Sequence, residues 1–200
     1  MAYSDFTVSK VRETFGLTIH ETMDLFANLA PFEPDEALQR TLNENLPLAT
    51  ANNTEKARSE LLITPILLTV RRQFELGFFS GIDFTVDPSQ GLNGFCDYLL
   101  TAAKDLYEVR QPLVTMVEAK NENIKAGLGQ CIAEMVAAQI FNQRSGTEQR
   151  QIYGCVTTGT EWKFLSLTHS TCQIDLRDYF IVELPQILGI LASPFRDKAP

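Results

Sequence analysis

The chain has 200 residues, of which 44% are hydrophobic and 21% charged, ordinary values for a globular protein with one core. Its formal net charge of −8 argues against indiscriminate nucleic-acid binding, which needs positive surface, but is compatible with a local basic groove. The cysteines stand singly, without a CxxC pair, which argues against a zinc ribbon and a dense disulfide scaffold. We expect Cys96, Cys131, Cys155 and Cys172 to be reduced, buried thiols.

No segment suggests export or a membrane. The first residues lack the basic region and long apolar run of a signal peptide. The most hydrophobic stretch, Leu61 to Val70, is about half the length that a membrane span needs and runs into Arg71. We therefore expect a cytoplasmic protein with no membrane partner.

Residues 1–50 are expected to form a peripheral, helical N-terminal extension, with a short helix around Thr7 to Thr14. Pro34, which two acidic residues follow, suits the first turn of a further helix, because proline loses no hydrogen bond there. Leu38 and Leu42 are four residues apart and would lie on one face of that helix.

A stronger helix is expected from Asn52, which has Glu55 three residues later, as in a capping box. Apolar residues then supply a broad face, and Pro65 inside the pattern is expected to kink or break the helix. Glu60 lies just before this apolar run. One acid beside a core-facing stripe is usually a solvated flank, so alone it carries little information.

From Phe78 to Thr101 the hydrophobic period changes to two, which predicts two strands joined by a turn at Asp87 to Gly91. Asp97 lies in the middle of the second, otherwise apolar strand. A carboxylate there is costly unless it is paired, and aspartate is a poor strand former. The alternative to a functional role is a structural aspartate held by hydrogen bonds.

The segment from Pro112 to Lys120 is expected to be a strand covered on both sides. Alternation would place Val114, Met116, Glu118 and Lys120 on one face. A carboxylate and an ammonium at the end of a buried strand are costly unless they pair or hold an ion. The alternative is a solvated strand end with an incidental ion pair.

A long helix is expected from Ile124 to Asn142, with Gly127 and Gly129 allowing its backbone to approach the sheet closely. Gln130 and Glu134 share a face of this helix, and such a polar pair is more often surface than site. Beyond it the pattern predicts a hairpin of Gln151–Thr157 and Trp162–Thr168, a short strand near Gln173 to Leu176, and a closing helix, Glu183 to Leu191, ended by Pro194.

This order of elements and charged residues resembles the PD-(D/E)xK superfamily of restriction-endonuclease-like nucleases. Asp97 and Glu118-Ala119-Lys120 match its signature, with Glu118 following Asp97 by 21 positions. The segment that begins at Glu60 resembles the first helix of several branches, including the N-terminal nuclease part of type I restriction subunits. Gln130 falls where many members carry a helix glutamine. The chain departs from the pattern at Cys96, often a proline, and at Glu134, a tyrosine in RecB-like branches.

The resemblance implies an α/β fold with a restriction-endonuclease-like core over 52–168. That core has a central mixed sheet flanked by helices in α-β-β-β-α-β order. The chain would be a single domain, 1–200, with extra N-terminal helices and a C-terminal strand and helix in 169–200. The implied activity is Mg²⁺- or Mn²⁺-dependent hydrolysis of phosphodiester bonds in DNA. The alternatives are a catalytically inactive nucleic-acid-binding or protein-interaction member of this fold, and an unrelated structural protein.

The resemblance also assigns roles to residues. Asp97 and Glu118 would hold the metal ion, and their carboxylates are ligands that Mg²⁺ prefers. Glu60 would bind a second metal or a metal-bound water, Lys120 would orient or deprotonate the attacking water, and Gln130 would bind phosphate or orient Lys120. Basic residues near these segments could contact nucleic acid: Lys56, Arg58 and Lys125, with Arg71, Arg72 and Lys104 further along the chain. A homodimer would suit cleavage of a duplex.

Overall fold

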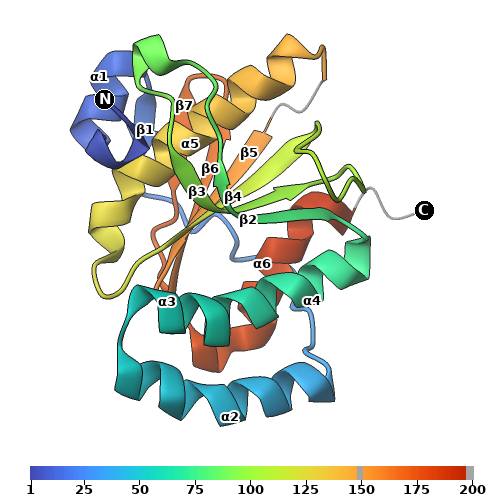
Figure 1. The fold of residues 1–200 in the computed structure, drawn as a ribbon. Helices are drawn as coiled ribbons and strands as arrows, with labels where there is room; N and C mark the ends of the chain where they lie inside the picture. Colours follow the sequence, from blue (N-terminus) through green and yellow to red (C-terminus); the bar gives the residue numbers. More distant parts are fainter. Residues whose placement is uncertain (148–150, 197–200) are drawn as a thin grey trace.

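A mixed sheet of eight strands runs through the residues that the computed structural model describes, 1–147 and 151–196 (Figure 1). Its strand order is β1-β7-β6-β5-β4-β3-β2, with β8 paired to β6. The pairs β1–β7 and β4–β5 are parallel and the other pairs are antiparallel. The strands are β1 Thr18–His20, β2 Gly77–Asp83, β3 Phe95–Thr101, β4 Leu113–Ala119, β5 Gln151–Thr157, β6 Glu161–Thr168, β7 Thr171–Ile174 and β8 Tyr179–Phe180.

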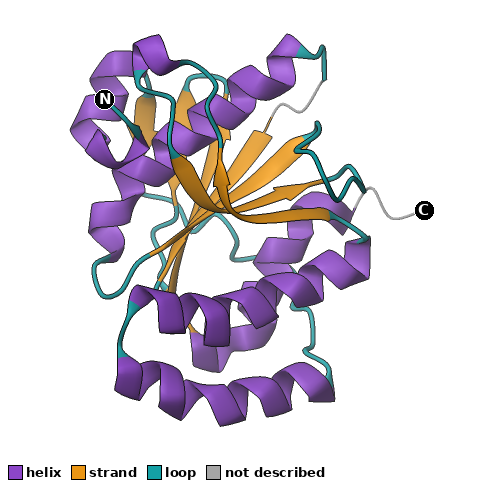
Figure 2. Ribbon diagram, viewed as in Figure 1, coloured by secondary structure: helices purple, strands orange, loops and turns teal. Residues whose placement is uncertain are grey.

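Helices cover both faces of this sheet, so the expected α/β class and mixed sheet are confirmed (Figure 2). One face packs on α5, with α1 beyond it, and the other packs on α4 and α6, with α2 beyond the helical segment of α3 and α4. Each interface has its own apolar cluster, which accounts for strands that are buried on both sides. The helices are α1 Val8–Phe15, α2 Glu36–Asn52, α3 Glu55–Arg58, α4 Thr64–Phe74, α5 Ile124–Arg144 and α6 Leu184–Arg196.

Strand β4 lies inside the sheet, between β3 and β5, and all its residues are buried, as expected. Its pairing with β3 shifts: Leu100 faces Thr115, but Thr101 faces Leu113, which leaves Val114 as an extra residue. This bulge reverses the alternation. Val114 therefore packs in the cluster on the α4 side, whereas Met116 packs on the α5 side. The expectation that they share a face is wrong for this reason.

The first 50 residues differ from the expected peripheral extension. Strand β1 joins the sheet beside β7, and the side chains of Tyr3, Phe6 and Val11 are buried against the α5 face. Helix α1 begins after Thr7, whose hydroxyl caps it by accepting from the Lys10 amide, close to the predicted helix.

The following helices begin at other residues than expected. Asp35 caps α2, so Pro34 lies just before the helix and not in its first turn, whereas Leu38 and Leu42 are buried on it as predicted. This helix continues through Asn52, so Thr54 caps the next segment by accepting from the Ala57 amide.

Pro65 does not break the helical segment that Thr54 starts. Helix α3 passes through a π-helical turn, Ser59–Ile63, into α4, and Pro65 lies in the first turn of α4. The π turn supplies the wider backbone path that a strict α-helix would not allow before proline.

The later elements follow the sequence closely. Strands β5 and β6 form the predicted hairpin, and α5 covers the predicted long helix. Strand β7 ends at Ile174, earlier than expected, and α6 continues past Pro194 to Arg196. All the cysteines are free and buried, as predicted. Within the described ranges, no helix has both the length and the apolar character needed to cross a membrane.

Candidate active site

Asp97 and the Glu118–Lys120 segment meet where β3 and β4 separate. The ladder between these strands ends at Tyr98 opposite Val117. Beyond that pair, a side chain replaces the backbone pairing: Asp97 Oδ2 accepts a hydrogen bond from the Ala119 amide at 2.7 Å. The backbone position between Glu118 and Lys120 is thus tied to Asp97. No donor among the described residues bonds the other oxygen, Oδ1.

Glu118 is a buried carboxylate with one partnered oxygen. Its side chain is 2% exposed, and its Oε1 forms an ion pair with the Lys120 ammonium. Its Oε2 is buried and, within the described residues, has no hydrogen-bond partner. Burial raises the pKa of Glu118 to about 8, and the negative charge of Asp97 adds to this rise, while Lys120 opposes it.

Lys120 is charged in this arrangement. Burial alone would lower its pKa, but the charge of Glu118 and the hydrogen bond between the two groups outweigh burial, so the pKa is raised. The side chain remains 22% exposed, so its ammonium can also face a ligand. Lys120 therefore neutralises part of the charge on Glu118 and stays a cation at neutral pH.

The backbone of α5 makes room for Lys120 at Gly127. A Cβ there would lie 2.7 Å from Cγ1 of Val156 and 3.1 Å from Cε of Lys120, so the expected close approach to the sheet is confirmed. The same expectation is wrong for Gly129, which packs on the backbone of Phe6 and Thr7 in the N-terminal segment.

Glu134 belongs to this cluster, although the sequence pattern favoured a surface position. Its side chain is fully buried on α5, where Gln130 Nε2 donates to its Oε1 at 3.1 Å, and it lies close enough to Glu118 for each acid to affect the pKa of the other. Burial, with the charge of Glu118, raises the pKa of Glu134 well above its ordinary value. The available signal was an acid inside an apolar run, Cys131 to Ala138. Gln130 thus bonds Glu134, and the structure shows no bond from it to Lys120.

Glu60 borders the site without joining the buried acids. It lies in the π turn and pairs with Lys56 at 3.3 Å, and both side chains are exposed. A pocket of about 320 Å³ contains Glu60 and Asp97 on its walls. The other lining residues come from the adjoining helical segment and from β2 and β3: Glu55, Lys56, Ser59, Thr64, Ser80, Gly81 and Tyr98.

The donor set suits a hard cation such as Mg²⁺. Asp97 and Glu118 each keep oxygen lone pairs beyond the hydrogen bonds described above, because an ionised carboxylate has about four acceptor sites. Mg²⁺ is commonly held by one or two carboxylates with water or phosphate completing its shell. In the described part of the chain, no group of three or more His, Cys, Asp or Glu side chains is placed to hold a metal ion. The residues present thus fit a two-carboxylate site and leave the remaining positions to solvent and substrate.

The basic residues expected to contact nucleic acid lie in different settings. Lys56 is exposed at the pocket, whereas Arg58 is 9% exposed and donates to Asn53, Thr158 and Thr160. A phosphate contact from Arg58 would have to replace these bonds. Lys125 lines another cavity, of about 490 Å³.

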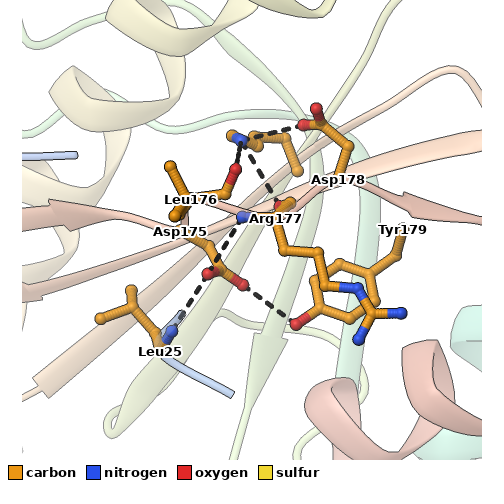
Figure 3. Close-up of polar contacts among 7 residues, drawn as sticks. Leu25, Asp175, Leu176, Arg177, Asp178 and Tyr179 are labelled. Carbon is orange, nitrogen blue, oxygen red and sulfur yellow. Dashed lines mark hydrogen bonds and ion pairs between the residues drawn. The ribbon is translucent and has the colours of Figure 1, made fainter. Parts of the chain in front are cut away.

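Beside β6 and β7, three of the charged side chains that line this larger cavity have hydrogen-bond or ion-pair partners within the described residues. Asp175 accepts from the Leu25 amide at 3.0 Å and from the Tyr179 hydroxyl at 3.1 Å (Figure 3). Asp178 pairs with Lys163, whose ammonium also bonds two backbone carbonyl groups. These contacts explain the local fold without any ligand.

No family model, curated protein or solved structure matches this chain.

Proposed function

We propose that this protein is a Mg²⁺- or Mn²⁺-dependent nuclease that hydrolyses phosphodiester bonds of DNA. The observation that carries the proposal is the hydrogen bond from the Ala119 amide to Asp97. It joins the lone strand aspartate to the residue between Glu118 and Lys120, so two carboxylates and an ammonium gather at one place. The order α4-β2-β3-β4-α5-β5, with β4 and β5 parallel, is also the order expected of a restriction-endonuclease-like core.

The residues have complementary tasks in such a reaction. Asp97 and Glu118 would hold the cation, which offsets negative charge on the phosphate and lowers the pKa of water. Lys120 is held as an ammonium by Glu118, so it would orient the attacking water and stabilise developing negative charge rather than act as a base. Gln130 donates a hydrogen bond to Glu134, and we give it no direct part in this reaction.

The second candidate is an inactive nucleic-acid-binding or protein-interaction member of the same fold. The observation that favours it is charge. The net charge is −8, and acids outnumber lysine on the walls of the pocket beside Asp97. An acidic pocket attracts a cation but repels bare phosphate, so catalysis depends on a bound metal ion.

Cleavage assays separate these candidates. Single-stranded, double-stranded and branched DNA would be incubated with wild type, Asp97→Asn and Lys120→Ala, in Mg²⁺, in Mn²⁺ and in EDTA. We expect metal-dependent cleavage by wild type and a loss of at least about 100-fold in each variant. Glu75→Gln is the control, because Glu75 pairs with Lys104 in an exposed position at the other end of β3. Inert wild type on every substrate would favour the binding protein, and full activity in both variants would refute the assigned site.

Melting curves test the metal site without cleavage. An ion that binds only the folded state adds about 2.7 kcal/mol at a hundredfold excess over Kd, so Mn²⁺ should raise the wild-type melting temperature. Asn at position 97 can still accept from the Ala119 amide, so Asp97→Asn should keep apo stability and lose most of that rise. A purely structural aspartate predicts the reverse: an unstable variant and no effect of metal in either protein.

A further inference from the structure

Glu134 is the buried acid to which the proposed mechanism gives no task. Its side chain has no exposure to solvent and lies between Gln130, which donates to Oε1, and Glu118 of β4. Oε2 of Glu134 and Oε2 of Glu118 are both buried, and each lacks a donor among the described residues. Two neighbouring buried acceptors without a donor are an unstable arrangement, because nothing replaces the water they lost.

One hydrogen atom on Glu134 satisfies both groups. A carboxylic acid at position 134 accepts from Gln130 with Oε1 and donates to Glu118 with the other oxygen. Lys120 holds the opposite oxygen of Glu118, Oε1. Donors on both sides fix the plane of the Glu118 carboxylate, and that plane decides how Glu118 can meet an ion shared with Asp97.

We propose that Glu134 is a positioning residue of the site: oriented by Gln130, it donates a hydrogen bond to Glu118 and holds that carboxylate in its ion-binding orientation. The inference rests on the proposed function and extends the site from the two strands to helix α5. The role needs a donor at position 134 and no change of protonation. Glutamine, which offers the same acceptor to Gln130 and a permanent donor to Glu118, performs it equally well.

Calorimetric titration with Mn²⁺ tests this role on the full chain, independently of cleavage. The proteins are wild type, Glu134→Gln, Glu134→Met and Asp97→Asn, with Glu75→Gln as an exposed control. Methionine has a similar volume but donates no hydrogen bond, so its variant should bind Mn²⁺ about 10- to 100-fold more weakly, the usual effect of losing a partner of a metal ligand. Glu134→Gln should bind like wild type. If Glu134→Met does not fold, Glu134→Ala takes its place.

The outcomes separate this inference from the proposed function. Wild-type affinity in Glu134→Met would overturn the inference and leave the nuclease proposal standing. Equal weakening by glutamine and methionine would also overturn it, because the carboxylate itself would then be needed as a ligand. If wild type and Asp97→Asn alike take up no Mn²⁺, the metal site fails, and the inference fails with it.

Discussion

At the scale of single residues, the unusual feature is a pair of buried acids with one nearby lysine. Burial raises the pKa of Glu118 from 4.5 to about 8 and shifts that of Glu134 in the same direction. A group whose pKa is higher in the folded state binds more protons when folded, so it contributes stability at low pH that is lost as pH rises. The stability of the metal-free protein should therefore fall between about pH 4.5 and about pH 8.

Melting curves in EDTA across that range measure this effect. Glu118→Gln removes one of the titrating groups, so its curve should be flatter than that of wild type, and the difference isolates Glu118 from other buried acids such as Asp175. Mg²⁺ should raise the melting temperature more at the alkaline end, because metal ligands must be deprotonated. A wild-type curve that rises with pH in EDTA would contradict this account of the two acids.

At the scale of elements, the link between α3 and the β5–β6 turn holds one side of the site together. Arg58 donates to the Thr158 carbonyl at 3.0 Å and, with two nitrogens, to Asn53 Oδ1. Asn53 in turn donates to Glu122 at 2.9 Å, in the loop that follows Lys120. Arg58 therefore connects three segments that are far apart in sequence.

Arg58→Ala should destabilise the fold by about 2–3 kcal/mol, since it removes bonds from a charged, buried donor. Lys56→Ala should change stability by less than about 1 kcal/mol, because its pair with Glu60 is exposed. Urea unfolding of both variants measures the difference. If Arg58→Ala keeps its stability but binds DNA more weakly, Arg58 contacts nucleic acid, as the sequence pattern predicted, and its structural role is refuted.

The elements that sequence patterns located well are those whose signal is local. Alternation and turn residues gave the β5–β6 hairpin, and helical spacing gave α5. The misplaced features depend on distant partners. The bulge at Val114 depends on the pairing of β4 with β3, and Glu134 is buried because α5 packs on β4 and β5. Asp97, Glu118 and Lys120 could be selected because costly groups in apolar strands are visible in sequence, whereas the environment of Glu134 is not.

At the scale of the whole molecule, four of the basic residues expected to contact nucleic acid lie towards opposite ends of β3. Arg71, Arg72 and Lys104 lie towards the end of β3 at Thr101, since Arg71 bonds the Leu76 carbonyl and Gly77 faces Thr101. Asp97 and the pocket lie towards the other end of β3, where Lys56 is exposed. Under the proposed function, a chain with 25 acidic and 17 basic side chains would need a local group of basic residues to bind DNA.

DNA binding should therefore weaken steeply with salt, and the slope should report which end is used. Each phosphate contact contributes about −0.9 to the slope of log K against log salt on duplex DNA. If DNA lies over the pocket, Lys56→Ala should make the slope less steep by about that amount, while Lys104→Ala, at the opposite end and paired with Glu75, should leave it unchanged. Fluorescence anisotropy over a salt series, in Ca²⁺ to prevent cleavage, measures both slopes. Binding that does not depend on salt would show that phosphate contacts are not its source. A slope altered by Lys104→Ala alone would show that DNA binds at the other end of β3, away from Asp97 and Glu118.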